Sequence, residues 1–470
     1  MSDKSSTDTA TRGRVLVDWR PEDADFWNGG GSRIAGRNLS ISIPALALAF
    51  AVWMVWSVVV VNLPNIGFKF TPDQLFWLTA LPGLSGATLR IFYSFVVPIF
   101  GGRRWTALST ASLLIPAIGI GFAVQDLSMP YEVFLSLALL CGFGGGNFAS
   151  SMSNISFFFP KAQKGNALAL NAGLGNLGVS VVQLVVPLVV TIDIFSSMVG
   201  APQDWVKGAV AKSMWLQNAG FVWVPLILIS ALAAWFGMND IASMRASFSE
   251  QAVIFKRKHN WLMCVLYIGT FGSFIGFSAG FPLLSKVSFP GVDILQYAFL
   301  GPLVGAASRA GSGWISDRWG GARVTMAAFV VMIAATVGVF YFLGHRGDAG
   351  AFWGFFAMFM VLFAATGVGN SSTFQMIPVI TRTERGRALV KSGLSEDQIR
   401  RQAEKEAAAI LGFSSAIGAY GAFFIPKSYG TAIAMTGAPD TALLFFAGFY
   451  VVCLLVTWWF YVRRHCDISC

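Results

Sequence analysis

Two arginines stand where a charged side chain is unexpected. Arg90 is the single charged residue of stretch 75–100, and Arg309 is the single one of stretch 294–316. About 20 apolar residues span a bilayer as a helix, so each arginine is a lone cation within a predicted transmembrane helix. A charge at that depth costs at least about 2.5 kcal/mol on insertion scales. Because a guanidinium is planar, forked and permanently charged, it suits a flat oxyanion. The structural alternative is that each arginine pairs with a carbonyl or with an acid from elsewhere.

The two arginines occupy equivalent positions of an internal repeat. Each stands 11 residues before a Gly-Gly pair, at 101–102 and 320–321, and Arg104 and Arg323 keep the same offset of 219 residues. Two further pairs are Gly-x-Gly-Asn at 144–147 and 367–370, and Gly-x-x-Gly at 175–178 and 418–421. The sequence therefore predicts two copies of one unit, each of which supplies one arginine.

The composition is that of a polytopic membrane protein. Of the 470 residues 55% are hydrophobic and 12% are charged, against about 25% charged in a soluble domain, so we expect no soluble enzyme domain. The polar start of the chain does not have the form of a cleavable signal peptide. The five cysteines show no metal or disulfide spacing, and the three histidines fall in or beside loops. No metal or cofactor is expected.

The apolar stretches predict an all-α membrane protein with twelve transmembrane helices. They are expected at about 40–62, 73–100, 106–124, 131–159, 165–192, 214–237, 259–285, 293–316, 321–344, 350–380, 407–429 and 440–462, with a polar outer loop at 193–213. The predicted parts are a cytoplasmic N-terminal segment (1–39), a six-helix bundle (40–237), a cytoplasmic linker (238–258), a second six-helix bundle (259–462) and a tail (463–470). A cytoplasmic, partly helical loop is expected at 381–406.

The net charge of +10 follows this topology. With both termini in the cytoplasm, 25 of the 33 lysines and arginines fall in cytoplasmic segments and six on the opposite face, as the positive-inside rule requires. The charge therefore indicates a lipid bilayer and not a nucleic-acid partner.

Six plus six helices in parallel repeats indicate the major facilitator fold. The segment 313–323 resembles the loop signature of that superfamily, Gly-x-x-x-Asp-Arg-x-Gly-x-x-Arg, and contains Asp317 and Arg318. The first-half copy at 96–104 keeps the glycine and the arginines but lacks the Asp-Arg pair. We expect Asp317 and Arg318 to form a cytoplasmic gating latch.

Glycines recur at helical spacing in the fifth and eleventh predicted helices. They are Gly173, Gly175 and Gly178 in the former, and Gly418 and Gly421 in the latter. Such spacing lets membrane helices approach closely, and close packing alone accounts for it. The functional interpretation adds that helices 2 and 8 slide past these thinned helices.

The stretch Ala-Gly-x-Gly-Asn-x-Gly at 172–178 resembles the signature of the nitrate/nitrite porter family. Further stretches similar to that family lie at 18–27, 78–90, 100–105, 146–161, 271–281 and 372–377. In the eleventh helix the pattern departs from the signature, because Ala419 stands where the fifth helix has Asn176. The resemblance covers nearly the whole chain and implies nitrate and nitrite as substrates.

The resemblance also implies the residues of the site. Arg90 and Arg309 would clamp the anion, Tyr267 and Phe271 would line the pocket with Phe148 opposite, and Asn176 and Ser415 would be polar contacts. Without the resemblance these aromatic residues would be interpreted as packing. Four amides, Asn147, Asn370, Gln183 and Gln375, are weaker candidates, since amides in membrane helices often bridge neighbours.

The resulting hypothesis is a monomeric, multi-pass antiporter of a bacterial inner membrane, which exchanges nitrate for nitrite by alternating access. The alternatives are proton-coupled nitrate uptake, exchange of another small anion, an anion channel, and a transporter-like sensor. The tail after the last helix is too short for a signalling domain, and the repeat argues against a channel. Exchange is favoured over symport because the predicted spans hold no histidine or carboxylate away from their ends.

Overall fold

The computed structural model describes residues 11–470 except 13, 196–197, 243–251, 390–394, 465, 467 and 469. Part of the predicted N-terminal segment (1–10 and 13), the middle of the predicted linker (243–251) and residues 390–394 of the predicted loop therefore lie outside the described residues.

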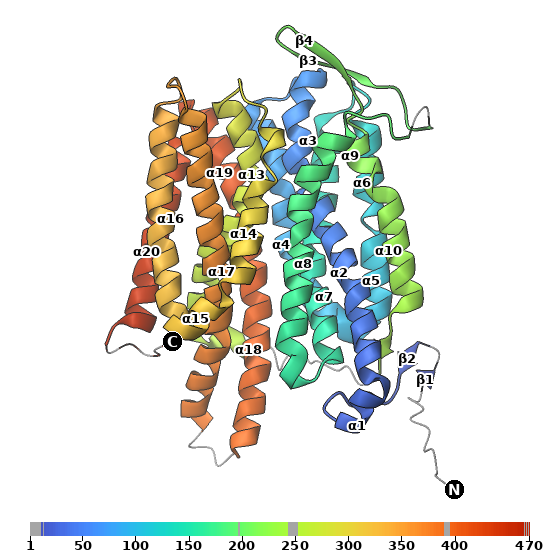
Figure 1. Cartoon of the computed structure of the whole chain (residues 1–470), viewed down its shortest axis with the longest axis vertical. Helices are drawn as coiled ribbons and strands as arrows, with labels where there is room; N and C mark the ends of the chain where they lie inside the picture. Colours follow the sequence, from blue (N-terminus) through green and yellow to red (C-terminus); the bar gives the residue numbers. More distant parts are fainter. Residues whose placement is uncertain are drawn as a thin grey trace.

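Helices from the first part of the chain run along the long axis of the molecule, on the right in Figure 1. After the short α1 (Ala24–Phe26) and a π-helical turn at Trp27–Gly31, they are α2 (Ser32–Met54), α3 (Trp56–Asn62), α4 (Pro72–Phe100), α5 (Gly102–Ala111), α6 (Leu114–Ala123), α7 (Tyr131–Phe158), α8 (Lys161–Val189), α9 (Asn218–Phe221) and α10 (Trp223–Gly237). The start of α4 has a local cause: Thr71 and Gln74 form a reciprocal capping box, and Pro72 occupies the first helical position.

Helices from the second part of the chain lie on the left in Figure 1. They are α12 (Lys258–Tyr267), the π-helical η5 (Ile268–Gly272), α13 (Ser273–Ser288), α14 (Leu300–Gly311), α15 (Gly313–Trp319), α16 (Gly321–Gly344), α17 (Ala351–Leu389), α18 (Glu396–Ala419), α19 (Gly421–Thr436) and α20 (Asp440–Thr457), which continues as the π-helical η8 (Trp458–Val462). Short 3-10 turns, η2 (Leu63–Ile66), η4 (Ala252–Lys256) and η6 (Ile294–Gln296), join neighbouring helices.

The repeat is visible in the backbone. Gly101, between α4 and α5, and Gly320, between α15 and α16, both have φ of +86°. Residues with a side chain rarely adopt a positive φ of this size, so both copies of the repeat need glycine at the turn. The matched geometry supports the common origin that the 219-residue offset predicts.

Within the described residues, 11 helices are long and apolar enough to cross a membrane. The missing twelfth is the predicted helix 293–316, which is wrong as one continuous helix, because α14 ends at Gly311 and α15 begins at Gly313. The break falls in Gly-Ser-Gly, and glycine is a poor former of helix interiors. Gln375 of α17 donates its side-chain N–H at 3.2 Å to the carbonyl of Gly313, the first residue of α15, and so links α17 to the segment after the break.

Two helices are longer than predicted on either side of the loop that joins them. The helix predicted to end at 380 continues as α17 to Leu389, and α18 already begins at Glu396, capped by Ser395 and Gln398. The predicted loop 381–406 is therefore mostly helical. These extensions form the lowest part of α17 and α18 in Figure 1.

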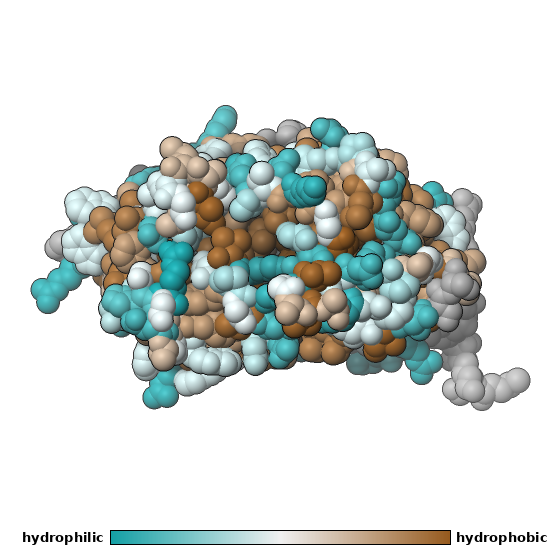
Figure 2. Space-filling model, turned by 90° about the horizontal axis from the view of Figure 1, so that it is seen from above, coloured by the Kyte–Doolittle hydropathy of each residue, from teal (hydrophilic) through white to brown (hydrophobic). Residues whose placement is uncertain are grey.

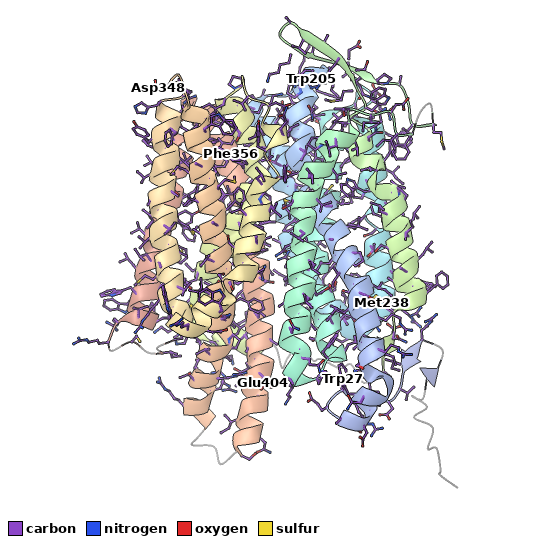
Figure 3. All side chains as sticks on the ribbon, in the orientation of Figure 1. Trp27, Trp205, Met238, Asp348, Phe356 and Glu404 are labelled. Carbon is purple, nitrogen blue, oxygen red and sulfur yellow. The ribbon has the colours of Figure 1, made fainter. Side chains whose placement is uncertain are left out.

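Two small sheets, which the sequence analysis did not predict, mark the two ends of the bundle. In the predicted outer loop, β3 (Gln203–Lys207) and β4 (Val210–Met214) pair antiparallel around a two-residue turn, with Lys207 opposite Val210. Trp205 of this hairpin donates to the Asn62 side chain at 3.2 Å, which anchors the hairpin over the end of α3 (Figure 3). We call this the hairpin end, and in Figure 2 it shows hydrophilic residues scattered among hydrophobic ones.

The opposite end carries the first described strands and Cys470, and we call it the termini end (Figure 1). There β2 (Val15–Leu16) pairs antiparallel with β1 (Thr11–Arg12) and parallel with β5 (Asp240–Ile241), which follows α10. The Cys470 carbonyl accepts from the Ala322 N–H at 3.2 Å, at the start of α16.

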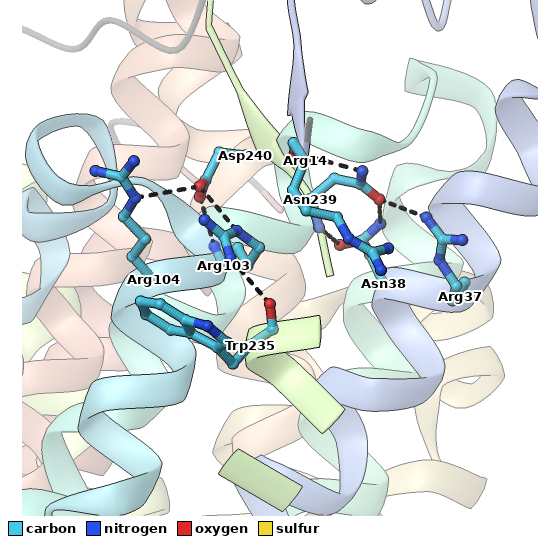
Figure 4. A network of polar contacts seen from close by, with 8 residues as sticks. All are labelled: Arg14, Arg37, Asn38, Arg103, Arg104, Trp235, Asn239 and Asp240. Atoms are coloured by element: carbon cyan, nitrogen blue, oxygen red, sulfur yellow. Dashed lines mark hydrogen bonds and ion pairs between the residues drawn. The ribbon is translucent and has the colours of Figure 1, made fainter. Parts of the chain in front are cut away.

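A buried ion pair joins α5 to β5 at the termini end (Figure 4). Asp240 accepts from the backbone and the guanidinium of Arg103 at 2.8 and 3.2 Å, and Arg104 lies 3.9 Å away. Asn239 beside it bonds to Arg37 and Asn38 of α2. The first-half copy of the loop signature, which lacks the Asp-Arg pair, thus receives a carboxylate from β5, just after α10.

Replacing this carboxylate should lower stability. We expect Asp240→Asn to cost roughly 1–3 kcal/mol, because Arg103 would stay buried without its counter-charge, and to lower the unfolding temperature in detergent. Asp18→Asn is the control, since the Asp18–Arg20 pair is exposed on both sides and such pairs contribute about 0–1 kcal/mol. Equal unfolding temperatures for both variants would contradict the assignment.

Candidate anion site

Arg90 is fully buried, with 0% exposure, in the middle of α4. Its Nε donates to the Gly145 carbonyl of α7 at 3.0 Å, and its Nη1 donates to the Ser415 carbonyl of α18 at 3.2 Å. Its Nη2 has no hydrogen-bond partner among the described residues. Carbonyls neutralise only part of a full charge, so Arg90 retains both an attraction for an anion and an unused donor.

Three aromatic rings surround the Arg90 guanidinium. Its central carbon lies 4.8 Å from the ring centre of Phe148, 5.3 Å from that of Trp53 and 5.5 Å from that of Phe271. These distances are within the range of cation–π attraction, which strengthens where water is excluded. The rings come from α7, α2 and η5, so residues of both parts of the chain converge on one charge.

Arg309 of α14 is held more loosely than Arg90. Its side chain is half-buried, its guanidinium carbon lies 5.9 Å from the ring centre of Phe374, and in the part of the chain that the structure describes it makes no side-chain hydrogen bond. No ion pair joins either Arg90 or Arg309 to an acid of the described chain. Both arginines and the buried Tyr267 hydroxyl lie within electrostatic range of one another.

The structure brings some of the predicted site residues together around Arg90. Phe148, Phe271 and the Ser415 backbone reach Arg90, and the Tyr267 and Phe271 rings pack against each other with centres 5.6 Å apart. The Ser415 hydroxyl, predicted as a polar contact, instead donates to the Gly412 carbonyl at 3.0 Å. Asn176 is buried in α8, and its side-chain oxygen has no partner among the described residues.

The weaker amide candidates divide into two kinds. Gln183 bridges helices, since it donates to the Ser57 hydroxyl and to the Ser278 carbonyl. Gln375 donates to the Gly313 carbonyl at the start of α15. Asn147 and Asn370, at equivalent positions of the repeat, are both buried with an unpartnered side-chain oxygen in the described structure.

Four of the five signature glycines, Gly175, Gly178, Gly418 and Gly421, pack closely against another helix. A Cβ at Gly175 would lie 2.6 Å from Leu46, and one at Gly178 would collide with the Ala47 carbonyl, both on α2. A Cβ at Gly418 would lie 2.8 Å from the Tyr267 ring, and one at Gly421 would collide with the Gly272 backbone. The first predicted helix (α2) and the seventh (α12 with η5) therefore make the closest contacts with these four glycines. The second predicted helix (α4) packs on α18 and α19, and the eighth (α14) packs on α8, so the sliding of helices 2 and 8 past helices 5 and 11 stays a prediction.

Asp317 and Arg318 are both exposed at the end of α15. Among the described residues neither takes part in an ion pair, so their role as a gating latch stays a prediction. The described ion pair of this kind lies in the first half, at Arg103 and Asp240.

Trp53 and Gly145 are the contacts of Arg90 that the sequence analysis did not name. A signal existed for Gly145, since it lies inside the repeated Gly-x-Gly-Asn motif. Nothing in the sequence distinguishes Trp53 from the nearby Trp56, since both are tryptophans in one apolar helix.

Two cavities lie away from Arg90 and Arg309. One of about 630 Å³ opens at the hairpin end beside Arg346 and Asp348, and an apolar one of about 520 Å³ lies between α2, α8 and α10. Among the described residues no group of three or more His, Cys, Asp or Glu side chains could hold a metal ion.

Comparison with known proteins places this geometry in a class. Residues 45–394 match the Major Facilitator Superfamily. The structure resembles that of the nucleoside transporter NupG, with a TM-score of 0.57, 14% identity and coverage of 90% of this chain and 98% of the other. It also resembles a bacterial homologue of the human lysosomal transporter Spinster in an inward-facing and occupied conformation, with a TM-score of 0.60, 14% identity and coverage of 91% and 96%. At these identities the structures bear on the fold alone.

Closer relatives define the family. The chain is 54% identical to the nitrate/nitrite transporters NarU of Salmonella typhimurium and of Escherichia coli, over 96% of this chain and 96% of each relative. It is 42% identical to the "Probable nitrate/nitrite antiporter NarK2" of Thermus thermophilus, over 98% of this chain and 99% of that protein. The chain therefore belongs to the major facilitator superfamily and, within it, to the nitrate/nitrite porter family.

The glycine contacts predict which alanine substitutions lower the stability of the protein. Gly178→Ala and Gly421→Ala place a methyl group against backbone that cannot yield locally, so each should lower stability by roughly 1–3 kcal/mol. Gly173→Ala is the matched control from the same motif, because nothing lies within 4 Å of its Cβ position. The measurement is the unfolding temperature in detergent, and an equal loss in all three variants would contradict the packing described here.

Proposed function

We propose that the protein is a nitrate/nitrite antiporter of a bacterial inner membrane, in which one anion at a time is clamped between Arg90 and Arg309. The observation that carries the proposal is the buried Arg90, whose Nη2 is unpartnered in the described structure while a second arginine lies within electrostatic range. The names of the relatives supply the substrates, nitrate and nitrite.

Each group has a role in this proposal. Arg90 presents its free N–H edge to one side of the planar anion, and Arg309 approaches from the other. Phe148 and Phe271 exclude water and confine the anion to the gap between the guanidinium groups. The Tyr267 hydroxyl and the Asn176 amide offer further donors.

The proposed topology places the termini end in the cytoplasm and the hairpin end outside, with the two bundles (40–237 and 259–462) moving as halves of a monomer. Contacts between the halves cluster near the hairpin end. Asp73 of α4 pairs with Lys427 of α19 at 2.7 Å, Lys286 of α13 donates to the Val61 carbonyl, and Gln183 of α8 donates to the Ser278 carbonyl. Such contacts support a state closed to the outside, which alternating access requires.

The rival function is proton-coupled nitrate uptake. It requires a group that titrates inside the membrane, and neither arginine pairs with an acid of the described chain. An empty site then holds two like charges, which oppose closure, whereas an anion between them permits it. This difference favours exchange, because the empty carrier returns less easily than the loaded one.

Lysine at either arginine should stop exchange. Arg90→Lys and Arg309→Lys keep the charge and lose the planar fork, and we expect nitrate counterflow in proteoliposomes to fall roughly 30-fold or more, the equivalent of a lost buried charged contact. Arg346→Lys, in the loop after α16, is the control. A lysine variant of Arg90 or Arg309 with normal counterflow would remove the clamp from the proposal.

The coupling mode has its own test. Proteoliposomes that contain nitrite should take up nitrate rapidly, and uptake should change little with a pH gradient, since arginine keeps its proton at any relevant pH. Proteoliposomes without an internal anion should take up little. Nitrate accumulation in these empty vesicles, driven by an imposed proton gradient, would establish symport instead.

A further inference from the structure

Trp53 connects the helices that hold Arg90. It lies near the end of α2 and is 0% exposed. Its Nε1 donates to the Pro82 carbonyl of α4 at 2.6 Å, two turns before Arg90 on the same helix. Its ring centre lies 5.3 Å from the Arg90 guanidinium carbon.

Two glycines make the space for this indole. A Cβ at Gly86 of α4 would lie 2.6 Å from the indole Nε1, and a Cβ at Gly145 of α7 would lie 2.7 Å from its Cε2. Gly145 is also the residue whose carbonyl accepts from the Arg90 Nε at 3.0 Å. The indole therefore touches both the guanidinium and the backbone segment that fixes it.

We infer that Trp53 is a positioning residue for anion binding, which holds Arg90 so that its unpartnered Nη2 faces the anion. The inference rests on the proposed function of Arg90 as an anion ligand. A desolvated arginine over an aromatic face is attracted to it, and a side chain already fixed before binding loses less conformational freedom when the ligand arrives.

The second half of the chain has no tryptophan at the position equivalent to Trp53. At the repeat offset of 219 residues, Trp53 corresponds to Gly272, which packs against Gly418 and Gly421. The nearest described cation–π partner of Arg309 is Phe374 at 5.9 Å. The fixed geometry is thus a property of Arg90 and not of the fold in general.

The test uses the full-length protein in detergent and measures the nitrate concentration that gives half-maximal thermal stabilisation. Trp53→Leu removes the aromatic face and the donor, and should weaken nitrate binding about tenfold. Trp53→Phe keeps a smaller face and should weaken binding about threefold. In proteoliposomes the same variants should raise the KM for nitrate counterflow by similar factors.

Trp56→Leu is the matched control for the loss of a buried tryptophan. Trp56 begins α3 and is 1% exposed, and its ring packs against Phe134, with centres 6.0 Å apart. We expect a lower unfolding temperature for Trp56→Leu with unchanged nitrate affinity. If Trp56→Leu weakens nitrate binding as much as Trp53→Leu, the role of Trp53 is merely structural and the inference is overturned.

Arg90→Lys in the same series separates the two proposals. If it leaves nitrate affinity unchanged, the proposed function of Arg90 fails. If it abolishes nitrate binding while both Trp53 variants bind as the wild type does, the positioning role alone fails. Should Trp53→Leu not fold, Trp53→Phe decides, since unchanged affinity in that variant overturns the inference.

Discussion

A buried cation that has no counter-ion among the described residues governs this structure. The guanidinium of Arg90 contacts two backbone carbonyls and three aromatic faces, none of which carries a full negative charge, and its Nη2 has no partner among the described residues. Backbone carbonyls reach a side chain in this way only where helices approach closely, which the glycines at 144–146 permit. The small residues of α7 and the charge of α4 are thus parts of one arrangement, and each would be unfavourable without the other.

The contacts of Arg90 also join the two halves of the chain. Its Nε bonds to α7 in the first half and its Nη1 to α18 in the second. Contacts between the halves near the hairpin end include the Asp73–Lys427 pair, with Lys427 also 4.4 Å from the Trp77 ring centre. Near the termini end the Lys161–Glu404 pair is longer, at 3.7 Å, and its Lys161 side chain is exposed. In the proposed function, opening the hairpin end would break the shorter pair, and an occupied site would offset that loss.

Features that follow from composition and from the internal repeat were predicted from the sequence. Breaks within helices and contacts between residues far apart in the chain were missed. Lone charges and apolar stretches were enough to locate Arg90, Arg309 and most helices. The break at Gly311–Gly313 was missed because hydropathy does not register a hydrogen-bonding change over three small residues. The Arg103–Asp240 pair was missed because its partners are 137 residues apart. Spacing identified the packing glycines, but it could not say that α2 and α12–η5 are their neighbours.

The difference between the two arginines follows from the same facts and bears on transport. Arg90 is fixed by an indole, two carbonyls and a continuous helix, whereas Arg309 stands three residues before the break between α14 and α15. Three residues are less than one helical turn, so a change of angle at the break alters the position of Arg309 with little effect on Arg90. The repeat therefore supplies two equal charges, one held rigidly and one beside a break in its helix. In the proposed function, Arg90 would define the site, and Arg309 would close it when an anion makes their approach favourable.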